Sequence, residues 1–176
     1  MEERKGEGKK KKKKRKRKNQ CTMTDPIRLT VLISGNGTNL QALIDKITTN
    51  QLNPTAKIIR VISNRKEAYG LERARKANIP TTYHNLVKYK KKQQQQQSNS
   101  DVQVQVQAAR EEYDADLAKI VLEDKPDLVV CLGFMHVLSE RFLEPLNLGR
   151  LKIINLHPAL PGAFNGVVGF FFFFFG

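Results

Sequence analysis

The stretch LTVLISGNGTNL at residues 29–40 decides the fold. Residues 29–33 form a short apolar run rich in β-branched side chains, which predicts a buried strand. Residues 34–39 are polar and contain two glycines, so they predict a turn. Apolar side chains then recur at helical spacing from Leu40 to Ile47. A strand, a turn and a helix in this order are typical of a βα unit.

The same alternation continues along the chain. Apolar periodicity predicts further helices that include residues 71–77 and 113–121. Short apolar runs predict four more strands, at residues 57–62, 81–83, 127–133 and 151–156. Strands separated by helices imply right-handed crossovers and a parallel sheet. We therefore predict an α/β fold with an open, doubly wound, Rossmann-like sheet.

The net charge of +14 is concentrated at the N-terminus. Residues 1–18 hold twelve Lys and Arg but three Glu, and their self-repulsion predicts a disordered basic tail over residues 1–25. It is either a solvated tail, with Met23 as the true start, or a nuclear-localisation or nucleic-acid patch. The absence of aromatic side chains among the lysines favours the solvated tail.

Two further segments have unusual composition. Residues 88–107 combine a Lys cluster, a Gln run and Val-Gln alternation, which predicts a mobile, low-complexity surface loop without function. Residues 167–176 contain six consecutive Phe and would aggregate if exposed. We interpret this second segment as aberrant, and our hypothesis is that it is a translated intron.

The two cysteines, Cys21 and Cys131, form no disulfide framework and favour a reducing compartment. We see no secretory signal and no apolar run of the roughly 20 residues that a membrane span needs. The expected location is the cytoplasm, with no membrane partner.

The turn at residues 34–39 is the first candidate site. Backbone N–H groups at the start of a helix favour an anion, and glycines let that anion approach the backbone closely. The loop is neither a Walker P-loop nor GxGxxG, so a nucleoside triphosphate or dinucleotide is not indicated. A tight turn with a helix cap remains the alternative.

The second candidate site is Asn155-Leu156-His157-Pro158, at the predicted carboxyl end of a strand. Strand alternation points Asn155 and His157 to the same side. Asn155 could then bind a developing oxyanion while His157 moves a proton. The alternative is a surface histidine held in a turn by Pro158.

The third candidate site is residues 133–138, just past another predicted strand. It could line a pocket for a flat apolar ligand, or it could be ordinary core packing. His136 is a less probable catalytic residue than His157, since no Asn or acid sits beside it in the sequence. His84 is interpreted as structural or exposed.

Together these segments resemble the glycinamide ribonucleotide transformylases, the fungal members most of all. The resemblance covers residues 26–166 apart from residues 88–107. It is strongest in four stretches, which read VLISGNGTNLQALID, VISNRKEAYGLERARKANIPT, DLVVCLGFMHVLSERFLEPL and IINLHPALPGAFNG. It implies the formyltransferase version of the Rossmann-like fold, incomplete at the C-terminus, with residues 26–166 as the N-terminal part of the catalytic domain.

The resemblance also implies an activity. A formyl group would pass from 10-formyltetrahydrofolate, the co-substrate, to the amine of glycinamide ribonucleotide in de novo purine synthesis, with no metal. Asn155 would orient the formyl oxygen and His157 would donate the proton. Phosphate-binding residues would be Gly37, Thr38 and Asn39. Folate-binding residues would be Arg110, Met135, His136, Val137, Leu138 and Asn155.

One departure from the family pattern stands out. The family places a catalytic Asp downstream of the histidine, whereas this sequence has no acidic residue after Glu144. We therefore expect the chain as written to have little or no activity. Two alternatives stay open: a sister folate-dependent formyltransferase, and a non-catalytic, basic nucleic-acid-binding fragment.

Overall fold

The computed structural model describes residues 25–52, 55–96 and 102–156. The basic tail, the Phe-rich segment and His157 lie outside the described residues. The strands are β1 (Ile27–Ile33), β2 (Ala56–Ser63), β3 (Thr81–Tyr83), β4 (Leu128–Leu132) and β5 (Lys152–Leu156). The helices are α1 (Thr38–Thr48), α2 (Tyr69–Lys76), α3 (Leu86–Gln96), α4 (Val102–Glu123) and α5 (Glu140–Leu148).

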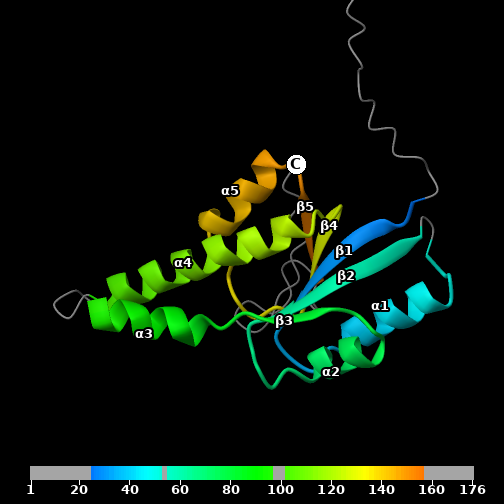
Figure 1. Cartoon of the computed structure of the whole chain (residues 1–176), viewed down its shortest axis with the longest axis horizontal. Helices are drawn as coiled ribbons and strands as arrows, with labels where there is room; N and C mark the ends of the chain where they lie inside the picture. The colour runs from blue at the N-terminus through cyan, green and yellow to red at the C-terminus, as the bar shows by residue number, and fades with distance from the viewer. Residues whose placement is uncertain (1–24, 53–54, 97–101, 157–176) are drawn as a thin grey trace, which may run out of the picture.

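The five strands form one parallel sheet in the order β3-β2-β1-β4-β5. Figure 1 shows α1 and α2 on one side of this sheet and α4 and α5 on the other. Both faces of the sheet are thus covered, which is why its strands read as nearly continuous apolar runs. The prediction of an α/β fold with an open, Rossmann-like parallel sheet is confirmed.

Two hydrophobic cores follow from this layering. Side chains of β1 alternate between them: Val31 and Ile33 pack with α1 and α2, while Leu32 packs with α4 and α5. All three are fully buried. Burying each such side chain stabilises the fold by about 1.5–3 kcal/mol. The central strand β1 therefore anchors the turn that follows it.

The prediction of a loop is wrong for residues 88–96 and 102–107, while residues 97–101 lie outside the described residues. The structure instead has helices α3 and α4 there, and Figure 1 shows them side by side as a helical hairpin. Lys and Gln are good helix formers, and the sequence interpretation weighed low complexity above that propensity. The Val-Gln alternation of residues 102–106 likewise lies in helix α4.

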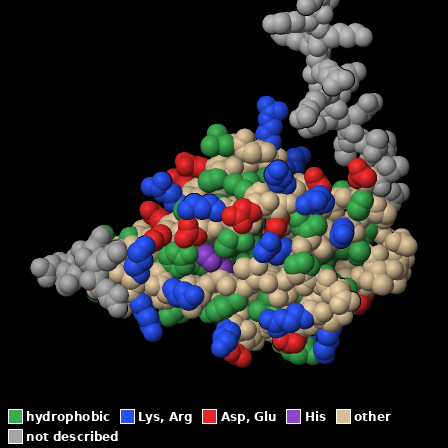
Figure 2. Space-filling view, viewed as in Figure 1, with side chains coloured by type: hydrophobic (Ala, Val, Ile, Leu, Met, Phe, Trp, Pro, Cys, Tyr) green, Lys and Arg blue, Asp and Glu red, His purple; other side chains and the backbone are tan. Residues whose placement is uncertain are grey.

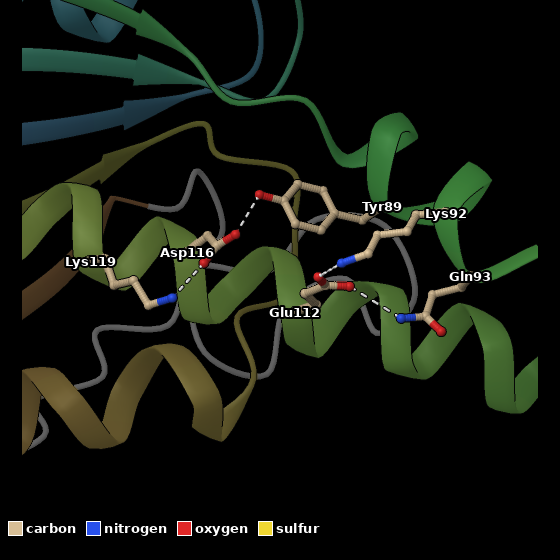
Figure 3. Close-up of polar contacts among 6 residues, drawn as sticks. All are labelled: Tyr89, Lys92, Gln93, Glu112, Asp116 and Lys119. Atoms are coloured by element: carbon tan, nitrogen blue, oxygen red, sulfur yellow. Dashed lines mark hydrogen bonds and ion pairs between the residues drawn. The ribbon is translucent and has the colours of Figure 1, made fainter. Parts of the chain in front are cut away.

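Polar contacts join the two helices of this hairpin (Figure 3). Lys92 of α3 forms an ion pair with Glu112 of α4, and the Gln93 side-chain amide donates to the same carboxylate. The Tyr89 hydroxyl donates to Asp116 at 2.8 Å. Long-range partners on α4, which composition alone does not reveal, thus hold α3 in place.

Candidate active site

The topological switch point of the sheet lies between the carboxyl ends of β1 and β4. These strands are neighbours, with Leu32 opposite Cys131. The chain leaves β1 toward α1 on one face of the sheet and leaves β4 toward α5 on the other. Ligands of open α/β sheets bind at such a switch point. Two loops border it: residues 34–37, which we call the glycine loop, and residues 133–139, which we call the β4–α5 loop.

Gly37 gives the glycine loop its shape. It has a φ of 68°, a left-handed conformation that favours glycine. A Cβ atom at Gly37 would lie 2.6 Å from the Cα of Gly70 in α2, so the two backbones touch. Arg73, also in α2, donates from Nε to the Asn36 carbonyl at 2.9 Å. Helix α2 therefore holds the glycine loop in place through these two contacts.

The glycine loop opens helix α1. No side chain caps this helix, and its first hydrogen bond runs from the Gln41 N–H to the Gly37 carbonyl at 2.9 Å. The Thr38 and Asn39 side chains are exposed. Uncapped N–H groups at a helix start attract an anion through the helix dipole and direct hydrogen bonds. The geometry therefore suits the predicted phosphate site.

A buried serine connects the two loops. Ser34 is 1% exposed, and its hydroxyl accepts a hydrogen bond from the Met135 backbone N–H at 2.7 Å. This bond joins the segments that follow β1 and β4. Sequence reasoning treated Ser34 as a turn residue and missed its role, because nothing in the sequence pairs it with position 135.

The β4–α5 loop alternates between exposed and buried side chains. Met135 and Val137 are 67% and 78% exposed, whereas His136 is buried. Phe134 and Leu138 are partly buried against the core of α4 and α5. Ordinary core packing therefore does not describe Met135 and Val137, which present apolar surface to the outside.

The sequence immediately around His136 contains no acid, but the fold brings one to its side chain. His136 Nε2 lies 2.6 Å from Oδ1 of Asp114, a fully buried residue of α4. The acid is 22 positions away in the sequence and reaches the loop through the packing of α4. Arg110, another candidate folate-binding residue, is half-buried one turn before Asp114 on the same face of α4.

His84 is structural rather than exposed. Its side chain is buried at the end of β3, where Nε2 lies 3.0 Å from the Tyr113 carbonyl oxygen. Its ring stacks on the Tyr113 ring with 4.3 Å between centroids. Burial lowers the pKa of His84, although the Tyr113 carbonyl acts in the opposite direction. A neutral His84 can donate from Nε2 to this carbonyl and pack among aromatic rings.

Asn155 lies near the end of β5, opposite Cys131 of β4. It is half-buried, and with Asn39 it lines an apolar trough of about 450 Å³ beside α1. The trough connects the start of α1 with the end of β5. The structure thus brings Asn39 and Asn155 to one cavity, while His157, two residues further on, lies outside the described residues.

Cys131 is a buried free thiol, and burial raises its pKa to about 12.

Among the described residues, no group of three or more His, Cys, Asp or Glu side chains could hold a metal ion. The helices within residues 25–52, 55–96 and 102–156 are all too short or too polar to cross a membrane. On the face shown in Figure 2, basic and acidic side chains are intermixed.

Comparisons with known proteins show the family to which this chain belongs. A family profile described as formyl transferase matches residues 27–169. Phosphoribosylglycinamide formyltransferase of Schizosaccharomyces pombe is 50% identical over 139 residues, which are 79% of this chain and 62% of the relative. The human trifunctional purine biosynthetic protein adenosine-3 is 37% identical over 79% of this chain and 12% of its own length.

A solved structure shows the same likeness. Phosphoribosylglycinamide formyltransferase from Coxiella burnetii superposes with a TM-score of 0.61 and 35% identity, covering 81% of this chain and 56% of that one. The chain spans about 62% of the length of each of the two yeast phosphoribosylglycinamide formyltransferases that it matches. With the family profile covering residues 27–169, this chain belongs to the formyl transferase family.

Proposed function

We propose that this chain contributes to the transfer of a formyl group from 10-formyltetrahydrofolate to the amine of glycinamide ribonucleotide. The observation that carries the proposal is the Ser34–Met135 hydrogen bond, which holds an anion-binding loop beside an apolar loop at the switch point of the sheet. A phosphorylated substrate needs the anion-binding loop, and a flat folate that reacts with this substrate needs an apolar surface next to it. The relatives named phosphoribosylglycinamide formyltransferase support the same reaction.

The nucleotide would bind at the glycine loop. Its phosphate would receive backbone N–H groups at the start of α1, supported by the Thr38 and Asn39 side chains, which are exposed there. The left-handed Gly37 lets the phosphate approach without meeting a side chain. The trough lined by Asn39 and Asn155 leads from this phosphate position toward the end of β5.

The folate would bind at the β4–α5 loop. Met135 and Val137 offer exposed apolar side chains, and Met adapts to flat rings. Leu138 supports them from a partly buried position, and Arg110 lies on the face of α4 that also carries Asp114. His136 would contribute through its backbone, because its ring is buried.

The chemistry is a direct transfer. The substrate amine attacks the formyl carbon, a new C–N bond forms, and the bond from that carbon to the folate nitrogen breaks. The amine loses a proton and the leaving folate nitrogen gains one. Asn155 would donate a hydrogen bond to the developing oxyanion, and His157 would move the proton.

The test uses the full chain with both ligands. We expect calorimetry to detect binding of glycinamide ribonucleotide and of 10-formyltetrahydrofolate, while folate-product absorbance measures whatever transfer takes place. Asn155→Ala should lower any transfer rate by about 100- to 1,000-fold, as for other donors to an oxyanion. Asn147→Ala, an exposed position in α5, is the matched control.

Binding of neither ligand would contradict the proposal. If the chain instead binds nucleic acid with steep salt dependence, the non-catalytic alternative is favoured. Transfer to a different formyl acceptor would assign the chain to a sister formyltransferase. The intermixed charges in Figure 2 offer no single basic face to nucleic acid in that view.

A further inference from the structure

Asp114 is a fully buried carboxylate at the middle of α4. Its Oδ1 lies 2.6 Å from His136 Nε2, and its Oδ2 accepts from the Ser139 backbone N–H at 2.8 Å. Both partners belong to the β4–α5 loop. One side chain therefore holds that loop at two points, three residues apart.

Such a group is an unexpected choice if stability alone matters. Moving a charged carboxylate out of water is costly unless it is paired and hydrogen-bonded. Buried ion pairs can often be replaced by apolar side chains of similar volume without loss of stability. The benefit of Asp114 therefore lies in the geometry that it imposes on the loop.

The His136 ring is enclosed on several sides. Its side chain is 3% exposed, and the Tyr113 and Phe134 rings lie edge-on with centroids 5.1 Å and 6.0 Å away. A ring held in this way has no free face for a ligand. His136 is thus the loop's anchor into the core, and its side chain does not itself contact folate.

Anchoring His136 fixes its neighbours. The chain bends at His136, and with this residue buried its neighbours Met135 and Val137 lie exposed on either side of it. Ser34 adds a third attachment, at the Met135 N–H. The two exposed apolar side chains are therefore presented by a backbone that is held at residues 135, 136 and 139.

We propose that Asp114 is a positioning residue, which acts through His136 and Ser139 to hold Met135 and Val137 in the orientation that receives the folate. This inference rests on the proposed function for the identity of the ligand. The anchoring itself does not depend on that identity. Displacements of about 1 Å around a reacting centre can lower a rate by about 100-fold, so such an anchor has functional consequences.

The first test is hydrogen exchange at the β4–α5 loop in the full chain without ligand. Asp114→Ala removes both acceptors and leaves His136 Nε2 unpaired, so the amides of Met135 to Ser139 should exchange at least about tenfold faster. Asp114→Asn keeps one acceptor oxygen and should restore part of the protection. Val121→Ala, in the same helix and also fully buried, is the matched control for lost packing.

The second test compares the two ligands. Asp114→Ala should weaken 10-formyltetrahydrofolate binding by about 10- to 100-fold, the size expected for lost hydrogen bonds to a charged group. Glycinamide ribonucleotide binding should change less than threefold. Val121→Ala should leave the ratio of the two affinities unchanged.

The outcomes separate the two proposals. If the chain binds no folate, the proposed function fails, but exchange at the loop still decides the anchoring role. If exchange in Asp114→Ala rises equally across the whole domain, or no more than in Val121→Ala at equal stability, the anchoring role is wrong. Equal losses of affinity for folate and nucleotide would also overturn it.

Discussion

The Ser34 hydroxyl accepts a hydrogen bond from the backbone N–H of Met135, 101 residues further along the chain. It is the direct physical connection between the glycine loop and the β4–α5 loop. Ser34 directly follows β1, whose last five residues are all buried, so the hydrogen bond ties both loops to that strand.

Ser34→Ala should weaken both ligands together, by about five- to tenfold, since one buried hydrogen bond contributes about 1 kcal/mol. The free energy of unfolding should fall by a similar amount. Calorimetry and urea titration measure the two effects. Thr49→Ala removes an exposed hydroxyl at the end of α1 and should change neither quantity much. Loss of affinity for one ligand alone would contradict the connecting role of Ser34.

Gly37→Ala should distort the glycine loop. Its left-handed φ costs an alanine about 1–2 kcal/mol, and the new Cβ would lie 2.6 Å from Gly70 Cα. We expect lower stability and weaker nucleotide binding with little change in folate affinity. Gly35→Ala is the matched control for stability, since a Cβ there has no atom within 4 Å. Equal destabilisation by both substitutions would show that the contact with α2 is unimportant.

Thr30→Val should stabilise the protein. The Thr30 side chain is fully buried in β1, and its hydroxyl has no hydrogen-bond partner within the described part of the chain. Valine has nearly the same shape without the unpaired oxygen, and strands favour it. The free energy of unfolding should rise by about 1 kcal/mol. A lower midpoint in urea would show that the hydroxyl has a partner outside the described residues.

His84 should make the fold sensitive to mild acid. Burial lowers its pKa below the ordinary value of 6.5, so the unfolded chain takes up the proton first. The stability that a neutral His84 provides is therefore present above about pH 6.5 and lost as the pH falls. His84→Asn should reduce this loss relative to the unmodified chain between pH 7 and 5. Parallel stability curves for the two proteins would contradict the shift.

Cys131 should resist alkylation in the folded protein. Burial raises its pKa to about 12, so little thiolate forms near neutral pH, and the thiol lies in the core that the sheet forms with α4 and α5. In a Cys21→Ser background, mass spectrometry should detect iodoacetamide labelling in urea but almost none in buffer. Rapid labelling in buffer would mean that the β4 region opens readily.

The sequence was sufficient for the sheet because each strand shows its own signal. The apolar run before Ser34 and the glycines after it predicted β1, the turn and α1 without knowledge of the rest. The interpretation failed where a segment is held by side chains that are far away in the sequence. Composition predicted a loop over residues 88–107, while the structure has helices joined by Tyr89–Asp116 and Lys92–Glu112 contacts.

The candidate site shows the same division. The turn of the glycine loop was predictable because backbone conformation is encoded locally, and the structure gives Gly37 a positive φ. The burial of His136 could not be predicted in this way, because it depends on Asp114, which belongs to helix α4 and is distant in the sequence. No periodicity or spacing indicates which of the many acidic residues of α4 will face the loop.

The contact between Gly37 and Gly70 limits how this protein can be redesigned. Replacing a glycine within a helix by alanine usually raises stability, by about 1 kcal/mol, and is a common step toward thermostable variants. At Gly70 the added Cβ would lie 2.5 Å from Ile33 Cδ1 and 3.1 Å from Gly37 Cα, so the same step would force α2 away from the turn. The two glycines therefore constrain one another. A side chain at either position, whether it arises by evolution or by design, would require helix α2 to move away from the glycine loop.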